Sequence, residues 1–572
     1  MSINTLPSPR VREFLPQEFK ITVWSKLKPY YNELLKRPIQ SALELERWIL
    51  DSSELDALFE EELHQRYIAM ISNPEDARAA DSFAYAKSEI TPHIQSIKKQ
   101  LNDKFLDDPF SLKLDGPSFE TYYRVVKSEY ESFEISDLKL YAEIEDMLRT
   151  YSKIITSSTF IHNDQTYNFT QVKSLLQSPD RTVRKAIYKK VSALQIQNAP
   201  LINSIFDGLV QKRSQLASKS GYDNYRNYRF NQTARYDYTS ETCHELYDFI
   251  GMLVCPLVED IFRKRKKSLA LDTLRPWDLE VPLPKDTPTK FEPDSNTLIQ
   301  KTIQCLDAIH PFFANCIQKM QQLNHINLNN SDSTPFGASA IALPLTGVPY
   351  LYLNSKSNLQ HIGSFLQLCG QAIHLCLINK HNIHVHRQIP SELSSLSAMT
   401  MQLLAFENGK FLFNDEAAAR QAKKWLLENI LIQLPWMAAF DRFQHWVYKN
   451  PQHSQEERDE AWRYIYTRFH STTIDFEGFE EAQSNYWHQA SSIFNTPLNY
   501  IENAFGLFGA IAIWKQYLES PKVAIEQFKN AMEAGYTLPI NEIFNIAGIP
   551  FFPSEEYIES LVAFVQAKLA EL

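Results

Sequence analysis

The chain has 572 residues, a net charge of −10 at pH 7 and a pI near 5.9. A mildly acidic chain lacks the basic surface with which proteins bind nucleic acid, and it has no general attraction to anionic membranes. The sequence contains no run of 18 apolar residues and no apolar leader within residues 1–10. We therefore expect no transmembrane helix and no secretion signal.

The composition predicts a mostly helical protein with a sizeable core. Hydrophobic residues make up 44% and charged residues 22%, and only 14 residues are glycine, about a third of ordinary usage. Few glycines leave few tight turns, which favours helices over sheets. The six cysteines form no CxxC pair, so we expect reduced thiols and a cytoplasmic protein.

Residues 14–153 read as a series of amphipathic helices, with the acids at 60–62 on a solvated face. Residues 154–169 are β-prone and contain a turn, which predicts a small hairpin. A helix start follows, with Ser178 as the N-cap, Pro179 at the first helical position and Asp180 in the first turn. Residues 221–228 and 235–238, rich in Tyr and Arg, are either a packed loop or a wall of a peptide-binding cleft. The basic run at 263–267 is typical of a solvated helix face or last turn.

A second β-prone region lies in the middle of the chain. Residues 350–353 (YLYL) form a short predicted strand, and residues 339–343 are its candidate neighbour. The edge of such a sheet can take up an extended peptide through main-chain hydrogen bonds. After residue 388 the pattern is helical to the end of the chain.

Residues 364–374 (SFLQLCGQAIH) predict an apolar helix with one polar face. Gln367, Gln371 and His374 are spaced by four and three residues, which places them on that face. A zinc-peptidase helix carries two imidazoles at i and i+4, with a carboxylate beside the first as general base. Here the same positions hold two carboxamides and Leu368.

By its ordered short motifs the chain resembles the M3 family of zinc metallopeptidases, in particular the oligoendopeptidase F branch. The matching segments are FLP at 14–16, GYDNY at 221–225, RYDY at 235–238, LRPWD at 274–278, PYLYLN at 349–354, PSE at 390–392, and residues 504–514. The resemblance implies an all-α, clam- or bowl-like body with a deep central cleft and a small β-sheet on the cleft wall. It also implies an N-terminal helical lobe (1–200) and a catalytic-type domain (201–572) in one continuous body.

The chain departs from the family at each catalytic motif. The family's H-E-x-G-H-A-x-H is QLCGQAIH at 367–374, so Gln367 and Gln371 stand at the zinc-ligand positions and Leu368 at the general-base position. The family's A-E-x-x-S-M-x-M-E is SSLSAMTMQ at 394–402, which puts Ser395 at the third ligand position. The family's H-x-F-x-x-P-F-Y-Y-x-x-Y is SIFNTPLNYIEN at 492–503. The transition-state His position is therefore Ser492, and Tyr500 is the one tyrosine retained.

These losses predict a chain without a zinc cofactor and without hydrolytic activity. Zinc requires imidazole, thiolate or carboxylate donors, and carboxamides and hydroxyls are poor substitutes. Without zinc no bound water becomes acidic, and without a carboxylate at 368 no group accepts its proton. A weak alternative is metal binding by histidines of an exposed, extended loop, with His374, His381, His384 and His386 as candidates.

Two functions remain open from the sequence. The first is a pseudo-peptidase that still holds short peptides, with Tyr350, Tyr352 and Tyr500 as candidate contacts, alone, as a homo-oligomer or paired with an active relative. The second is an oligopeptide-cleaving metalloendopeptidase with non-standard metal ligation, or another hydrolase that uses the same cleft. A relic with only a structural role would bind no peptide.

Overall fold

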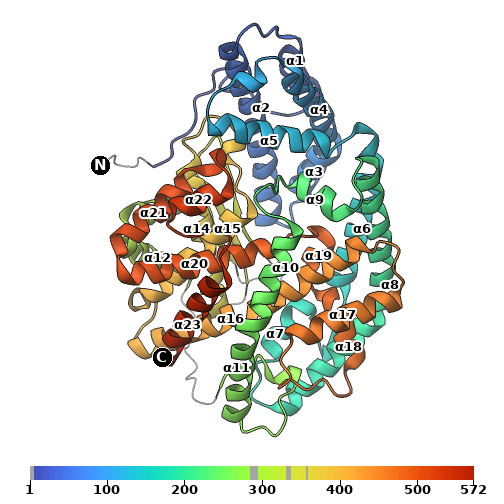
Figure 1. Ribbon diagram of the computed structural model, residues 1–572, viewed down its shortest axis with the longest axis vertical. Coiled ribbons are helices and arrows are strands. Elements are labelled where there is room, and N and C mark those ends of the chain that lie inside the picture. Colours follow the sequence, from blue (N-terminus) through green and yellow to red (C-terminus); the bar gives the residue numbers. More distant parts are fainter. Residues whose placement is uncertain (1–5, 284–293, 330–336, 356–358) are drawn as a thin grey trace. The chain divides into compact units, whose positions relative to one another are not determined.

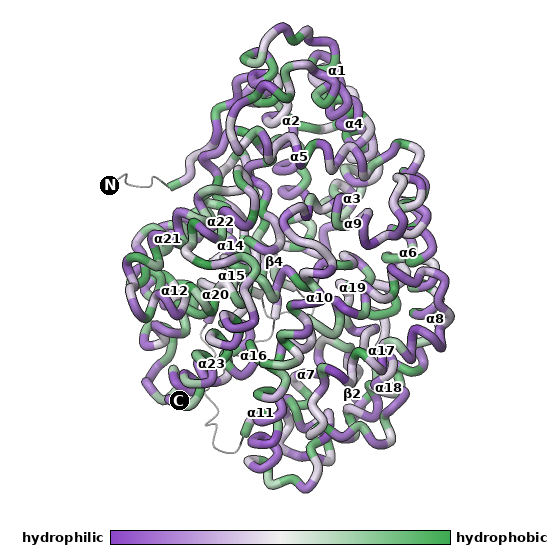
Figure 2. Tube along the Cα trace, in the orientation of Figure 1, coloured by the Kyte–Doolittle hydropathy of each residue, from purple (hydrophilic) through white to green (hydrophobic). Residues whose placement is uncertain are grey.

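The computed structural model describes residues 6–283, 294–329, 337–355 and 359–572 (Figure 1). The described chain is mainly helical, with two small sheets. Along the helices hydrophobic and hydrophilic residues alternate (Figure 2), as expected for helices with one buried face. The chain falls into two compact units that interleave in sequence. Unit 1 comprises residues 1–135, 291–423 and 505–554, and unit 2 comprises residues 136–290, 424–504 and 555–572.

Unit 1 carries an N-terminal group of helices and a central helical layer beside a three-stranded sheet. Its helices are α1 (Trp24–Lys36), α2 (Ala42–Ser72), α3 (Ala77–Tyr85), α4 (Thr91–Asp107), α5 (Pro117–Glu131), α12 (Ser295–Ile309), α13 (Pro311–Gln322), α14 (Leu359–Ile378), α15 (Ser391–Glu407), α21 (Pro521–Glu533) and α22 (Ile540–Ile546). Most of α20 (Ile501–Glu519) and the first turns of α16 (Glu416–Lys449) also belong to this unit.

The sheet of unit 1 has the strand order β3-β5-β4. Strand β5 (Tyr350–Asn354) pairs antiparallel with β4 (Gly337–Ile341), which confirms the pairing predicted from the sequence. The parallel partner β3 (Ile326–Asn329) was not predicted. Strand β4 lies at the edge of this sheet and packs beside α14.

Unit 2 is built around two long helices. Its elements are α6 (Leu138–Ser157), β1 (Thr159–His162), β2 (Gln165–Asn168), α7 (Val172–Leu175), α8 (Arg181–Lys219), α9 (Tyr225–Gln232), α10 (Ser240–Phe249), α11 (Cys255–Ser268), most of α16, α17 (Gln455–Phe469), α18 (Glu480–Ser484), α19 (Ser491–Asn495) and α23 (Glu555–Ala570). The β1–β2 pair is the antiparallel hairpin expected near residues 154–169. The basic run ends α11, as predicted. The proposed boundary at residue 200 stays a prediction; helix α8 runs through that position.

The start of α8 corrects a detail of the sequence prediction. The N-cap is Asp180, whose carboxylate accepts a hydrogen bond from the Thr182 amide at 2.8 Å, rather than Ser178. Pro179 therefore precedes the helix. An Asp directly before the first helical residue satisfies an amide that would otherwise lack a partner, and its charge also favours the helix N-terminus.

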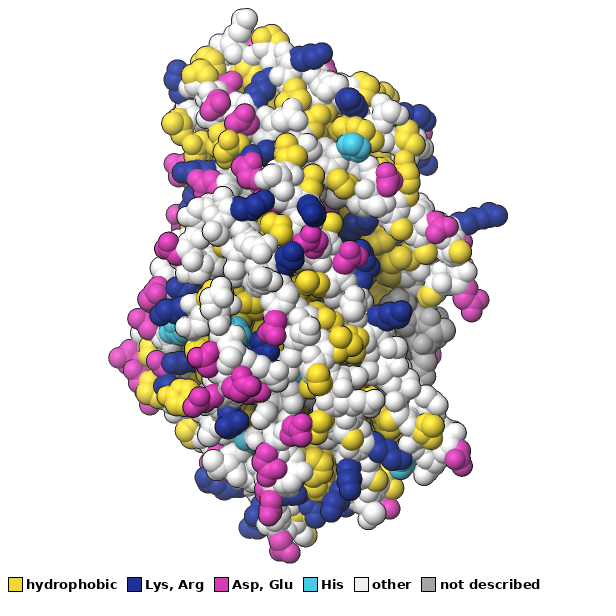
Figure 3. Space-filling view, turned by 90° about the vertical axis from the view of Figure 1, so that its right-hand side faces the viewer, with side chains coloured by type: hydrophobic (Ala, Val, Ile, Leu, Met, Phe, Trp, Pro, Cys, Tyr) yellow, Lys and Arg dark blue, Asp and Glu magenta, His cyan; other side chains and the backbone are white. Residues whose placement is uncertain are grey.

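Helix α14 lies deep in unit 1. It is the one described helix long and apolar enough to cross a membrane, and 78% of its most apolar window is buried inside the protein. A buried core helix passes the same test of length and composition, so this is weak evidence for a membrane span. On the face drawn in Figure 3, acidic and basic side chains are interspersed, and neither forms a large continuous area.

Candidate functional site

Helices α14 and α15 pack against each other at very close range in unit 1. A Cβ atom at Gly370 would overlap the carbonyl oxygen of Ser397 and approach the Cβ of Met401 to 2.9 Å. Only glycine allows this approach of two helix backbones. The contact fixes which residues of α14 face α15, and it therefore places the polar face of α14.

The two carboxamides of that polar face are hydrogen-bonded to α15. Gln367 Nε2 donates to Gln402 Oε1 at 3.0 Å, and Gln371 Nε2 donates to the Ser394 hydroxyl at 3.1 Å. Between them Leu368 is buried, at 4% exposure. The polar face of α14 thus serves as a pair of cross-links between two helices.

Ser395 lies where a third helix joins the pair. It is 8% exposed, and its Cβ would be 2.5 Å from a Cβ at Gly506 of α20. A small side chain at 395 and a glycine at 506 therefore allow α15 and α20 to meet closely. The three positions that the family resemblance assigns to zinc ligands all take part in helix packing.

This donor set does not fit zinc. It offers two carboxamides and one hydroxyl, and the carboxamide nitrogens already donate to neighbouring oxygens. Within residues 6–283, 294–329, 337–355 and 359–572, no three His, Cys, Asp or Glu side chains converge as a metal-ligand group. No catalytic step is therefore derived through a metal.

Three of the four candidate histidines each meet a different partner. His381 Nε2 lies 3.0 Å from the Glu533 carbonyl, His386 Nε2 lies 2.9 Å from the Ser118 carbonyl, and His384 Nε2 lies 2.8 Å from a Glu60 carboxylate oxygen. His374 is 1% exposed, and burial lowers its pKa to about 3. The rings of His381 and His386 lie edge to face with their centroids 6.3 Å apart, but the structure does not bring all four rings together.

The expectation that the histidine loop is exposed was wrong. His384 and His386 are buried, at 5% and 4% exposure, and residues 385–387 form a short 3₁₀ turn. The alternation of polar residues suggested an extended, solvated segment. Instead, carbonyl and carboxylate groups from distant parts of unit 1 accept hydrogen bonds from these rings, and this makes their burial tolerable.

The acids at 60–62 also differ from the solvated face predicted for them. Glu61 is 6% exposed and accepts hydrogen bonds from the amides of Leu345 and Thr346 at 2.6 and 2.9 Å. Glu60 is about 30% exposed, and contact with His384 lowers its pKa against the opposing effect of burial. No pattern in the sequence marks these two acids as different from a solvated run, because their partners lie more than 280 residues away.

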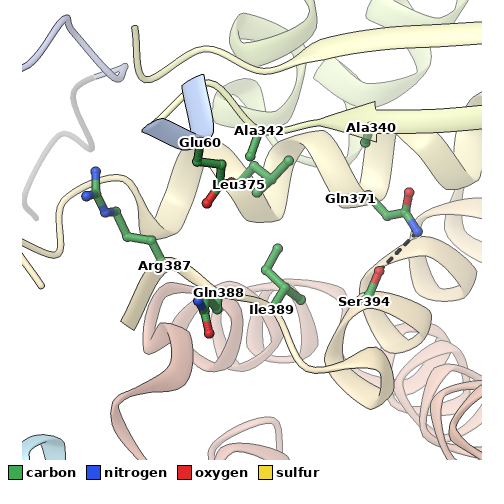
Figure 4. A pocket seen from close by; sticks show the side chains of 9 residues that line it. All are labelled: Glu60, Ala340, Ala342, Gln371, Leu375, Arg387, Gln388, Ile389 and Ser394. Carbon is green, nitrogen blue, oxygen red and sulfur yellow. Dashed lines mark hydrogen bonds between the residues drawn. The ribbon is translucent and has the colours of Figure 1, made fainter. Parts of the chain in front are cut away.

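A pocket of about 280 Å³ lies beside the C-terminal half of α14. Its walls come from α2, β4, α14, the segment 387–389 and the start of α15; the lining residues are Glu60, Ala340, Ala342, Gln371, Leu375, Arg387, Gln388, Ile389 and Ser394. Figure 4 shows Leu375 and Ile389 on opposite sides of the space, with the hydrogen-bonded pair Gln371 and Ser394 at one end. The pocket thus adjoins the second ligand position of the resemblance.

Of the predicted peptide contacts on the sheet, Tyr350 is half-buried, and its hydroxyl lies 3.2 Å from the Ser72 hydroxyl. Tyr352 is 4% exposed and packs with Ile71 and Ile341. Strand β5 is the central strand, so the edge next to α14 is β4. Peptide contact by either tyrosine remains a prediction.

The other motif of the resemblance forms a tightly held loop in unit 2. Leu498 is buried and has a left-handed backbone (φ 57°), and its amide donates to Gln444 Oε1 at 2.7 Å. Arg213 donates to the Phe494 carbonyl and Arg229 to the Pro497 carbonyl. A strained residue persists only where its surroundings over-determine it. No pattern in the sequence marks Arg213 or Gln444 as the groups that hold this loop.

Ser492 and Tyr500 are both partly exposed in unit 2. Burial raises the pKa of Tyr500, with a further contribution from Asp441, and its ring lies 5.9 Å from that of Phe440. The Tyr/Arg-rich segments nearby are packed: Tyr225, Tyr228 and Tyr238 are all buried. Tyr236 is exposed and residues 225–228 belong to helix α9, so packing describes part of these segments, and their role as a wall of a peptide-binding cleft stays a prediction.

Two family models of the M3 peptidases match parts of the chain outside the α14–α15 helix pair. Residues 14–133 match the model of the peptidase M3 N-terminal domain, and residues 174–302 match that of peptidase family M3; neither range includes α14. These matches support membership of peptidase family M3.

Similar proteins support this assignment. Oligopeptidase PepF of Bacillus subtilis is 21% identical over 527 residues, which cover 86% of this chain and 73% of that protein. The structure of PZ peptidase A with an inhibitor superposes with a TM-score of 0.89 at 19% identity, covering 98% of this chain and 99% of that one. A putative oligoendopeptidase F from Bacillus anthracis gives 0.85 at 18% identity, with 97% and 98% covered. These structures establish the fold.

Proposed function

We propose that this chain is a catalytically inactive member of peptidase family M3 that retains a site for short peptides. The observation that carries the proposal is the state of the α14 polar face, where Gln367 and Gln371 are hydrogen-bonded to Gln402 and Ser394. Hydrolysis would need a metal-bound water and a base, and the base position holds the buried Leu368. Ser395 stands at the position of the third zinc ligand and Ser492 at that of the histidine that stabilises the intermediate, so these two groups are missing as well.

Peptide binding is supported by what remains around that helix. The edge strand β4 lies beside α14 and could pair with an extended chain, and a pocket opens next to it. The proposed setting is the cytoplasm, with no nucleic-acid or membrane partner and no cofactor. The proposed assembly is a homo-oligomer or a complex with an active relative.

The test uses the unmodified protein, purified without chelator. We expect less than a tenth of an equivalent of zinc per chain, no cleavage of a quenched fluorescent peptide library, and saturable binding of short peptides by fluorescence anisotropy. Stoichiometric zinc with chelator-sensitive cleavage would instead establish the metalloendopeptidase with non-standard ligation. In that case His384→Ala and His386→Ala should lower the zinc content if the histidine loop holds the metal.

A further inference from the structure

The pocket beside α14 has apolar walls and polar ends. Its apolar walls are formed by Ala340, Ala342, Leu375 and Ile389, and its polar ends hold oxygen atoms that accept hydrogen bonds. A volume of about 280 Å³ is at or below the lower end for small-molecule sites. The space therefore suits one long side chain better than a whole ligand.

Glu60 supplies the charge at one end. Its Oε2 lies 2.8 Å from His384 Nε2, whereas its Oε1 accepts no hydrogen bond from any described residue; His64 Nδ1 is 3.8 Å away and is bonded to the Ala342 carbonyl instead. In Figure 4 the carboxylate is directed into the space beside Leu375. A carboxylate oxygen left open in a partly enclosed pocket is complementary to a cationic donor.

The position of Glu60 is fixed by its neighbours on α2. Glu61 binds the amides of Leu345 and Thr346, and His64 binds the Ala342 carbonyl at 2.8 Å. These bonds attach α2 to the segment that follows β4. The carboxylate is thus pre-organised at the pocket rather than placed there by a free surface side chain.

The nearby cation does not occupy this place. Arg387 is 8% exposed, its Nη1 donates to the Pro344 carbonyl at 2.9 Å, and it makes no ion pair within 4 Å with Glu60. In Figure 4 its guanidinium is turned away from Leu375 and Ile389. The remaining polar side chains of the lining are Gln371, Gln388 and Ser394, whose oxygens can also accept hydrogen bonds from a cationic group.

We propose that this pocket is a specificity site for a lysine or arginine side chain of a bound peptide, whose methylene stem packs between Leu375 and Ile389 and whose cationic head binds Glu60. The arrangement matches the amphipathic build of these side chains, which bury an apolar stem and keep the charged end with polar partners. The proposal rests on the proposed peptide-binding function and names the class of peptide.

The test compares capped alanine-based heptapeptides with lysine, norleucine or glutamate at the central position. For the unmodified protein we expect the lysine peptide to bind about tenfold or more tightly than the norleucine peptide, in keeping with a hydrogen-bonded charge pair. Glu60→Gln should reduce that ratio to near one. Glu62→Gln, the same change two residues along α2 and outside the pocket, should leave the ratio unchanged.

A second variant distinguishes loss of the specificity site from a folding defect. A second probe tests the pocket independently of the proposed peptide-binding function. Ile389→Trp, which fills the pocket but keeps Glu60, should also abolish the lysine preference. Nα-acetyl-lysine methylamide, followed by saturation-transfer NMR against its norleucine analogue, tests the pocket without any peptide site. Peptide binding without lysine preference overturns the specificity site alone. Glu60-dependent binding of the lysine amide without peptide binding overturns only the peptide-binding function, and the loss of both signals overturns both proposals.

Discussion

Restoring the zinc-peptidase residues on α14 gives a stringent test of the inactive site. The variant is Gln367→His, Leu368→Glu and Gln371→His. It removes two side-chain hydrogen bonds between α14 and α15, each contributing about 1 kcal/mol. It also replaces the buried Leu368, which forfeits about 2 kcal/mol of apolar burial and adds the desolvation of a carboxyl group. We expect a net destabilisation of roughly 4–6 kcal/mol, concentrated in unit 1.

We expect no peptidase activity from this variant, because Ser395 and Ser492 still stand where the third ligand and the transition-state histidine would be needed. The assays are zinc per chain after dialysis, cleavage of a quenched fluorescent peptide, and hydrogen exchange of peptides from α14 and α15. Gln367→Asn with Gln371→Asn is the matched control, since it shortens the cross-links without adding ligands. Measurable zinc-dependent cleavage by the triple variant would refute the roles given to Ser395 and Ser492, the positions of the missing third ligand and transition-state histidine.

Three further predictions concern stability. Gly370→Ala should destabilise unit 1 by about 1–3 kcal/mol through backbone overlap with Ser397, whereas Gly251→Ala, whose Cβ would meet only Phe469 at 3.6 Å, should be neutral or slightly stabilising in denaturant unfolding. Burial lowers the pKa of His374 from 6.5 to about 3 in the folded chain, so the unfolded chain binds a proton at higher pH than the folded chain does. The free energy of unfolding should therefore fall as the pH drops below about 6.5. His374→Leu should flatten this pH dependence in thermal unfolding measured between pH 4 and 7. Asp278→Asn should lower the free energy of unfolding by about 3–5 kcal/mol, because it leaves Arg181 and the buried Arg184 without their shared carboxylate. Asp475 is more exposed and pairs with Arg275, so Asp475→Asn is the control, and an equal effect of the two variants would contradict the prediction.

The sequence predicted elements whose signals are local. The β1–β2 hairpin, the strand Tyr350–Asn354 with its antiparallel neighbour, and the basic last turn of α11 all follow from composition, spacing and turn residues. Strand β3 has only four residues and pairs in parallel with a strand more than 20 residues away, so no local pattern marks it. The N-cap of α8 was misplaced by two residues because Ser178 and Asp180 are both good caps.

The candidate site was less predictable where its partners are distant in sequence. Apolar-helix periodicity placed Gln367 and Gln371 on one face of α14, yet it could not show that Gln402 and Ser394 would meet them. The buried histidines and the acids at 60 and 61 look like solvated residues in the sequence, since their partners lie 152 to 324 residues away. Buried polar groups are satisfied by tertiary structure, which a single sequence does not display.

The proposed loss of zinc requires that other contacts join the helices around α14. Where metal ligands join helices, binding free energy is also folding free energy. In this chain the same helices are joined by two carboxamide hydrogen bonds, by the glycine contact at 370 and by the contact between Ser395 and Gly506. If the proposed loss of zinc holds, the stability of unit 1 should be indifferent to chelators. The features left for a function are the edge of β4 and the pocket at Glu60, which is why the peptide experiments rather than metal reconstitution bear most directly on what this protein does.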